Sequence, residues 1–266
     1  MQIIGEKING TRKQVGQAIA DRNTVFIQDL ARRQAEAGVN WLDINAGGSP
    51  DKEPEALAWL VKTVQEVTNV SLCLDSANPE ALSTAIPYVK QLPMVNSVSG
   101  ERKKLEQVLP LVVKYKCPVI MLAMDDRGIP KTVEERMDII DLLVKEARSH
   151  HLADDLLYID PLVMAIAVNT ESANVALQTM RSIRSKYPGV HIVSGLSNVS
   201  FGLPVRSLIN RVFITLAIEA GMDTAILDPL DKGLVSTILA SELVLGKDRF
   251  CLNYTRAFRS GKLEGK

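Results

Sequence analysis

Eight short apolar runs recur along the chain about every thirty residues, and longer stretches with helical periodicity separate them. Rich in β-branched residues, the runs cover residues 2–6, 40–45, 71–75, 94–97, 119–123, 157–160, 191–195 and 224–227. Each run has the length of a strand, and no linker or low-complexity tract interrupts the series. Because eight strand–helix units fit within 266 residues, the sequence predicts an α/β fold, a (β/α)8 TIM barrel forming a single domain over residues 1–266.

The competing fold is a doubly wound open sheet, which normally has fewer strands and a glycine-rich nucleotide loop. The segment Gly5-Glu-Lys-Ile-Asn-Gly10 is not such a loop, and no G-x-x-x-x-G-K-[ST] segment occurs. The barrel is therefore the favoured prediction.

The predicted helices follow the apolar periodicity between the strands. They cover residues 23–37, 53–67, 80–90, 101–116, 133–150, 171–186 and 230–245, with a further helix opened by Pro204. Gly38 is expected to end the first of them in a left-handed conformation, and Pro87 is expected to kink or end the third. The basic tail after the last helix is expected to be loosely held.

Composition and charge narrow the classes of partner and compartment. Lys plus Arg (31) balance Asp plus Glu (31), and aromatic residues make up only 5% of the chain. A nucleic-acid partner and an anionic membrane surface are therefore not expected. The start of the chain lacks the pattern of a signal peptide, no apolar run approaches the ~20 residues that span a bilayer, and three distant cysteines favour neither disulfides nor a metal site. We expect a cytoplasmic protein.

Carboxylates and carboxamides lie at or just beyond the ends of almost all the predicted strands. The set comprises Glu6, Asn9, Asp43, Asn45, Asp75, Asn96, Asp125, Asp160, Asn198 and Asp228. In a barrel these strand ends converge on one mouth, where catalytic residues are found. Helix capping accounts for part of the pattern, but Asp75 and Asp160 come directly after a buried run, before any loop begins.

The segment from Gly195 to Arg211 has the same character, because a strand leads into Ser197, Asn198 and Ser200 before a helix. A serine-rich capping turn is the alternative interpretation of this segment.

The strand ends lack the residues of several common chemistries. None of the three histidines ends a strand, no set has the spacing of metal ligands or of a Ser-His-Asp triad, and no strand is predicted to end in lysine. A mouth lined by Asp and Asn suits a flat neutral heterocycle rich in N–H donors, since one carboxylate accepts two parallel hydrogen bonds. Pterins and purines have such an edge.

Eight segments in order give the chain a specific resemblance to a known family. They are Ile-Ile-Gly-Glu-Lys-Ile-Asn-Gly10, Leu-Asp43-Ile-Asn-Ala-Gly47, Leu-Cys-Leu-Asp75-Ser, Val-Asn96-Ser, Gly128-Ile-Pro-Lys131, Tyr-Ile-Asp160-Pro, Gly195-Leu-Ser-Asn198-Val-Ser and Leu-Ile-Asn210-Arg. With them the chain resembles, almost end to end, the methyltetrahydrofolate:corrinoid protein methyltransferases. These are pterin-binding barrels related to the folate domain of cobalamin-dependent methionine synthase.

The resemblance implies a folate site at the mouth of the barrel. Asp75, Asn96 and Asp160 match positions that hydrogen-bond the pterin ring, and Asn198 matches the asparagine that reaches N5, where the methyl group is carried. The remaining implied contacts are Gly195, Ser197 and Arg206 around the pterin and its benzoyl arm, and Ile226 against the ring. Phe201 departs from the pattern, since acetogenic relatives carry a polar residue near the folate there.

The resemblance also implies the reaction and its partners. Tetrahydrofolate or 5-methyltetrahydrofolate is the substrate, and a separate corrinoid protein supplies the cobalamin, because the chain has no Asp-x-His-x-x-Gly segment. Asn198 is expected to stabilise charge at N5, and Asp160 to reach the same atom through water. A homodimer is expected, and the direction of transfer stays open between acetogenesis and O- or N-demethylation.

Two other functions remain as alternatives. Dihydropteroate synthases share the barrel, but their strand-7 loop carries Ser-x-Arg with a nearby lysine, whereas this loop reads Gly-Leu-Ser-Asn198. A non-catalytic folate-binding subunit would use the same contacts for binding alone.

Overall fold

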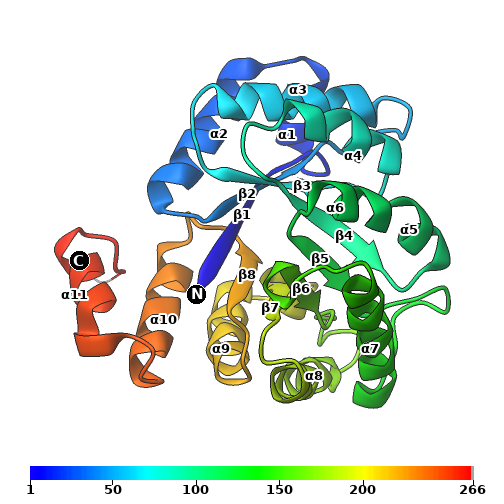
Figure 1. Ribbon diagram of the computed structural model, residues 1–266. Helices are drawn as coiled ribbons and strands as arrows, with labels where there is room; N and C mark the ends of the chain where they lie inside the picture. Colours follow the sequence, from blue (N-terminus) through cyan, green and yellow to red (C-terminus); the bar gives the residue numbers. More distant parts are fainter. Residues whose placement is uncertain (265–266) are drawn as a thin grey trace.

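The computed structural model describes residues 1–264 and contains a closed barrel of eight parallel strands, in sequence order around the ring (Figure 1). The strands are β1 (Gln2–Asn9), β2 (Trp41–Asn45), β3 (Ser71–Asp75), β4 (Met94–Ser99), β5 (Val119–Leu122), β6 (Leu157–Asp160), β7 (His191–Gly195) and β8 (Thr224–Leu227). The (β/α)8 prediction is confirmed, and every predicted run is a strand. The main difference is that β1 continues three residues beyond Glu6. Of the predicted domain, only residues 265–266 lie outside the described residues.

Helices surround the barrel, as Figure 1 shows. They are α1 (Lys13–Ala20), α2 (Thr24–Ala37), α3 (Glu53–Gln65), α4 (Pro79–Ala85), α5 (Arg102–Gln107), α6 (Leu109–Tyr115), α7 (Val133–Ser149), α8 (Ser172–Lys186), α9 (Arg206–Glu219), α10 (Lys232–Val244) and α11 (Leu252–Arg259). Gly38 caps α2 with a φ of 92°, as predicted. The helix containing Pro87 ends early, because α4 stops at Ala85 and a short 3-10 turn follows.

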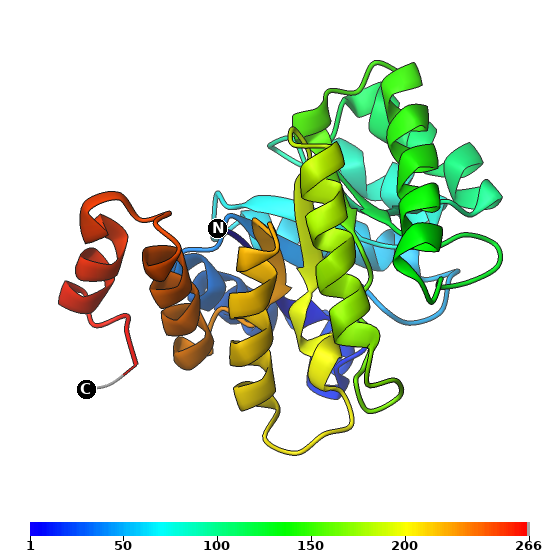
Figure 2. The same cartoon turned by 90° about the horizontal axis from the view of Figure 1, so that it is seen from below.

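Two predictions about the helices are wrong. The expected helix over 101–116 is two helices, α5 and α6, because Pro110 lies in the first turn of α6 and lacks the N–H of a continuous helix. Pro204 precedes α9 instead of opening it, since Val205 between them has a φ of 50°. The tail after the last predicted helix contains α11, which lies outside α10 in both Figure 1 and Figure 2.

The barrel interior is filled by a small apolar core that forms the floor of the mouth. Its buried members are Ile4, Cys73, Met94, Ile120, Tyr158 and Val193, with Trp41, Leu122 and Ile226 partly buried around them. A larger core fills the space between the strands and the helices. Successive side chains on a strand point to opposite faces, so the residues two positions beyond this inner core also point into the barrel.

The ends of β1 and β2 meet through glycine backbones. A Cβ atom on Gly10 would lie 2.1 Å from the carbonyl oxygen of Ala46, and one on Gly47 would lie 2.8 Å from the carbonyl carbon of Gly10. A side chain at either position would push these two loops apart. This backbone contact fixes the loop that follows Asn45, and that loop forms part of the mouth of the barrel.

Among residues 1–264, none of the helices has both the length and the apolar character needed to cross a membrane.

Candidate active site

Polar side chains occupy the inward positions above the inner core. Glu6 lies two residues beyond Ile4, Asp75 two beyond Cys73, and the same offset places Asn96, Asp160 and Asp228 beyond Met94, Tyr158 and Ile226. On β2, Asp43 and Asn45 follow Trp41 at the same period. These seven of the ten predicted strand-end residues therefore point into one mouth, whereas Asp125 lies on the loop beyond β5.

Two carboxamide–carboxylate hydrogen bonds connect β2, β3 and β4 at this mouth. Asn45 donates through Nδ2 to Oδ2 of Asp75 at 2.9 Å, and Asn96 donates through Nδ2 to Oδ1 of Asp43 at 3.3 Å. Asn45 is itself fixed, because its Oδ1 accepts from the N–H of Gly47 at 2.8 Å. The carboxylates are thus held in place while Asp75 retains oxygen lone pairs that face the mouth.

Burial governs the proton affinity of these carboxyl groups. Desolvation raises the pKa of Asp43 well above its ordinary value, and the nearby charge of Asp75 raises it further. The pKa of Asp75 is also raised by desolvation, with the Asn45 hydrogen bond acting in the opposite direction. A ligand that donates N–H groups to these oxygens would replace the lost hydration and favour their charged forms.

Asp160 lies apart from that network, at the end of β6. Its Oδ1 accepts from the N–H of Leu162 at 2.8 Å, and its side chain is buried. Desolvation raises the pKa of Asp160 to about 7, although the Leu162 hydrogen bond and the charge of Arg136 both act to lower it. A carboxyl group with this pKa exchanges its proton near neutral pH, which suits general acid–base chemistry.

Arg136 is a functional candidate that the sequence interpretation missed. It is only 2% exposed, and its guanidinium donates to the carbonyl oxygens of Pro161 at 2.7 Å, Leu162 at 2.8 Å and Pro130 at 3.2 Å. It therefore joins the loops after β5 and β6 and fixes the backbone beside Asp160. The signal was present in the sequence: Arg136 falls on the apolar stripe of its helix, three residues before Ile139.

The loop after β7 places Asn198 beside the end of its strand. The loop is a 3-10 helix, η3 (Leu196–Ser200), and a Cβ atom on Gly195 would lie 3.2 Å from Nδ2 of Asn198. The carboxamide thus folds back over the last residue of β7, where the missing side chain leaves room for it. Asn198 is exposed to the mouth, and Gly195 pairs in register with Ile226 of β8.

Arg206 holds this loop together from the first turn of α9. It donates to the carbonyl oxygen of Ser197 at 2.7 Å and to Oγ of Ser200 at 3.1 Å, and its guanidinium lies 5.8 Å from the ring centroid of Phe201. The serine-rich capping turn of the alternative interpretation is not observed, because neither η3 nor α9 has a side-chain cap; the two serines instead accept hydrogen bonds from Arg206. The Phe201 ring is 67% exposed, so it presents an apolar face at the rim of the mouth.

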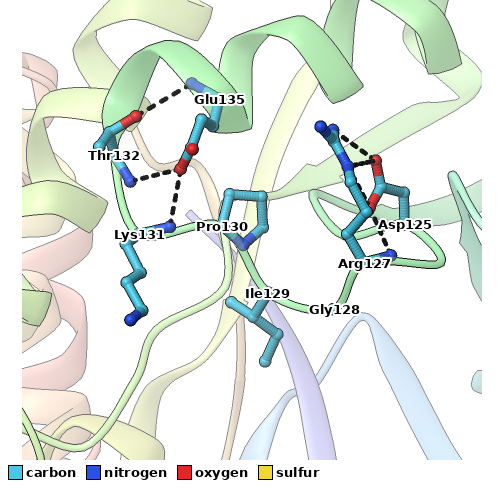
Figure 3. A pocket seen from close by; sticks show the side chains of 8 residues that line it. All are labelled: Asp125, Arg127, Gly128, Ile129, Pro130, Lys131, Thr132 and Glu135. Carbon is cyan, nitrogen blue, oxygen red and sulfur yellow. Dashed lines mark hydrogen bonds and ion pairs between the residues drawn. The ribbon is translucent and has the colours of Figure 1, made fainter.

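A cavity of about 370 Å³ lies in the loop between β5 and α7 (Figure 3). Asp125 lies on this loop, beyond the end of β5, and forms an ion pair with Arg127 at 2.7 Å. Glu135 accepts from the backbone N–H groups of Lys131 and Thr132 at 3.1 and 3.3 Å, which fixes the start of α7. Within the described chain the ammonium of Lys131 has no hydrogen bond or ion pair.

An ion pair joins β1 to the end of β8 at the mouth. Lys7 lies two residues before the end of β1, and its Nζ contacts Oδ2 of Asp228 at 2.6 Å. The neighbouring Glu6 pairs with Arg12 at 3.1 Å, and burial raises the pKa of Glu6. Lys7 is therefore engaged by a carboxylate at this site. In residues 1–264 no group of three His, Cys, Asp or Glu side chains is arranged to hold a metal ion.

Comparison with known proteins identifies the family to which the chain belongs. The family model described as "Pterin binding enzyme" matches residues 6–228, which includes every strand end discussed above. The chain belongs to the pterin-binding enzymes.

Among the curated relatives of this pterin-binding enzyme, one matches over nearly its whole length. The chain is 42% identical over 265 residues to the methylcorrinoid:tetrahydrofolate methyltransferase of Eubacterium limosum, with 99% of this chain and 98% of the relative covered. It is also 27% identical over 240 residues to the methionine synthase of Mycobacterium leprae, covering 84% of this chain but only 20% of that protein. The predicted resemblance to both groups is confirmed.

Solved structures of dihydropteroate synthases share the fold of this pterin-binding enzyme. The protein from Coxiella burnetii in complex with pteroic acid superposes with a TM-score of 0.70 at 15% identity, covering 91% of this chain and 92% of that one. The protein from Xanthomonas albilineans in complex with 7,8-dihydropteroate gives a TM-score of 0.64 at 18% identity, covering 94% and 93% of the two chains. At these identities the likeness extends to the fold alone.

Replacing Arg136 by methionine tests its proposed positioning role beside Asp160. The substitution removes three hydrogen bonds from one buried and two partly buried carbonyl groups, and we expect the free energy of unfolding to fall by about 3 kcal/mol. It also removes a cation, so the pKa of Asp160 should rise above about 7. Urea denaturation and titration of Asp160 by NMR measure the two effects. The surface variant Arg33→Met is the control, with an expected loss below about 0.5 kcal/mol; equal losses in both would contradict the assignment.

Proposed function

We propose that this chain transfers a methyl group between the cobalt of a corrinoid carried by a partner protein and N5 of tetrahydrofolate. The observation that carries the proposal is the mouth itself, where Asp75 and Asn96 are fixed on one side and Asn198 folds over Gly195 on another. The 42% identity over the whole chain to a methylcorrinoid:tetrahydrofolate methyltransferase supports it. That name also favours methyl transfer from the corrinoid to tetrahydrofolate. We also propose that residues 1–266 form a single domain.

In this proposal the pterin lies across the inner core with its N–H edge toward β3 and β4. Asp75 accepts from the amidine-like N–H groups, and Asn96 and Asp160 complete the hydrogen bonding of the ring. The ring covers Ile226, and the benzoyl arm leaves the mouth past the β7 loop. That loop supplies the remaining contacts, which are Gly195, Ser197, Phe201 and Arg206.

The chemistry requires charge stabilisation at one nitrogen atom. In the direction that forms methyltetrahydrofolate, the N5 lone pair bonds to the methyl carbon, the electron pair of the cobalt–carbon bond stays with cobalt, and N5 loses its proton. Asn198 cannot serve as a general acid or base near neutral pH, so it stabilises the changing charge through a hydrogen bond. Asp160 accepts the proton through water, since a carboxyl with a pKa of about 7 is partly ionised at neutral pH.

One assay separates this function from the alternatives. We expect the protein, mixed with tetrahydrofolate and methylcobalamin, to demethylate the corrinoid, with a visible change in its absorption spectrum and faster turnover on a corrinoid protein. Tight folate binding without spectral change would favour a non-catalytic folate-binding subunit. Formation of dihydropteroate and pyrophosphate from a dihydropterin pyrophosphate and aminobenzoate would favour a dihydropteroate synthase-like enzyme.

The variants Asn198→Ala and Asp75→Ala divide catalysis from binding. Loss of the Asn198 carboxamide should raise the barrier for transfer by about 2–4 kcal/mol, while folate affinity changes less. Asp75→Ala should mainly weaken folate binding, because that carboxylate faces the non-reacting edge of the pterin. Single-turnover rates and calorimetric affinities measure both. Equal losses of rate and affinity in Asn198→Ala would contradict its role.

Asp160 predicts the pH dependence of the reaction. The carboxyl is protonated below about pH 7 and ionised above it, so transfer to tetrahydrofolate should accelerate as pH rises through about 7 and then level off. The reverse transfer should slow over the same interval. In Asp160→Asn this step in the pH profile should disappear. A profile that keeps its midpoint in the variant would assign the titration to another group.

We further propose a homodimer that forms through the outer face of α9. Leu208, Val212 and Leu216 recur every four residues on this face and are 61%, 55% and 44% exposed, while the opposite face packs into the barrel. A helix that is apolar on both faces is normally buried on both, and a single stripe suits a two-fold interface. Val212→Asp should convert the dimer to a monomer in analytical ultracentrifugation, whereas a monomeric unsubstituted protein would refute the interface.

The cytoplasm is proposed as the compartment, because Cys73, Cys117 and Cys251 are all free thiols.

A further inference from the structure

Three large apolar side chains stand exposed on the loops after β6 and β7. Val168 is 83% exposed, Phe201 67% and Val205 70%, and we refer to these three residues as the rim patch. In Figure 2 the two loops extend past the ends of the strands at the same edge of the barrel. The rim patch therefore lies on the face of the molecule that carries the site.

The two loops are joined, so the rim patch is one surface. The N–H of Ile166 donates to the carbonyl oxygen of Val199 at 3.1 Å, and a Cβ atom on Gly202 would touch that of Ala167 at 3.7 Å. Asn198 belongs to the same loop as Phe201 and Val205. The rim patch thus continues directly from the residue assigned to N5.

This surface is almost without charge. Across residues 165–170 and 197–208 the single charged side chain is Arg206, whereas 23% of the whole chain is charged. The guanidinium of Arg206 is already engaged with Ser197, Ser200 and the Phe201 ring. A partner that covers these loops therefore meets apolar side chains and neutral polar groups.

The backbone at Val205 adopts a strained conformation, although the apolar side chain of this residue is exposed. Val205 has a φ of 50°, a left-handed conformation that is strongly disfavoured for a β-branched residue. The side chain gains little burial in return. Strain of this kind clusters at active sites, ligand clamps and switch regions.

We propose that the rim patch is the docking surface for the corrinoid-carrying protein, contacting the edge of the corrin ring on the side of the β6 and β7 loops. The inference rests on the proposed function, since methyl transfer requires cobalt to approach N5 and hence requires the macrocycle to cover the mouth. The corrin edge bears methyl groups and neutral amide arms. An apolar surface with few charges matches this edge, because charged side chains there would lose their hydration without gaining a partner.

Val168→Asp is the test variant, and Val244→Asp is its matched control. Both valines are exposed to the same extent, 83% and 84%, but Val244 is the last residue of α10, far along the chain from the mouth loops. With a purified corrinoid protein as methyl donor, Val168→Asp should raise KM for that protein at least tenfold. Its KM for free methylcobalamin should rise as well, because that donor carries the same corrin edge, while its affinity for tetrahydrofolate should match that of the unsubstituted protein. Val205→Asp should behave in the same way.

The outcomes separate the docking surface from the proposed function. Unchanged KM for the corrinoid protein in Val168→Asp and Val205→Asp, or an equal rise in the control Val244→Asp, would overturn the docking surface while methyl transfer stands. If the unsubstituted protein transfers no methyl group from either donor, the proposed function fails. Docking is then decided by calorimetric titration with the corrinoid protein, where binding unaffected by Val168→Asp overturns it. Circular dichroism and sedimentation should show an unchanged fold and mass in each variant.

Discussion

The structure depends on burying carboxyl groups at the end of an apolar barrel. Asp43, Asp75 and Asp160 extend inward directly above side chains that exclude water, and desolvation raises the pKa of each carboxyl. Burial of a charge is costly unless hydrogen bonds replace its hydration. The surrounding residues supply part of that replacement: Asn45 and Asn96 donate to two of the carboxylates, and the N–H of Leu162 donates to the third. A ligand rich in N–H donors would supply the rest.

The mouth has two sides with different physical characters. On the side of β2 to β4 the polar groups are tied to one another and to the backbone, which gives a rigid surface for recognising a flat ring. On the side of β6 and β7 lie the Asp160 carboxyl, whose pKa is raised to about 7, the exposed carboxamide of Asn198 and loops with few charged side chains. In the proposed function, the first side binds the pterin ring, and the second side carries out the reaction and contacts the corrinoid protein.

Much of the fold was predictable because strands buried on both faces are continuous apolar runs. Asp75 and Asp160 were predictable for the same reason, since a carboxylate directly after such a run must lie at a strand end. The contacts across the mouth were not, because Asn45 and Asp75 are thirty residues apart and only closure of the barrel brings them together. The break between α5 and α6 was predictable, because Pro110 lacks the backbone N–H that a continuous helix requires. The left-handed turn at Val205 was not readable, because valine is among the residues least suited to it.

The most direct test of the proposed site is a crystal structure of the protein with tetrahydrofolate bound. We predict that the pterin ring lies above Ile226, with its N–H edge within hydrogen-bond distance of Asp75 and N5 facing the carboxamide of Asn198. A pterin bound elsewhere, such as in the cavity of the β5–α7 loop, would contradict it. So would a ring turned to place N5 against Asp75.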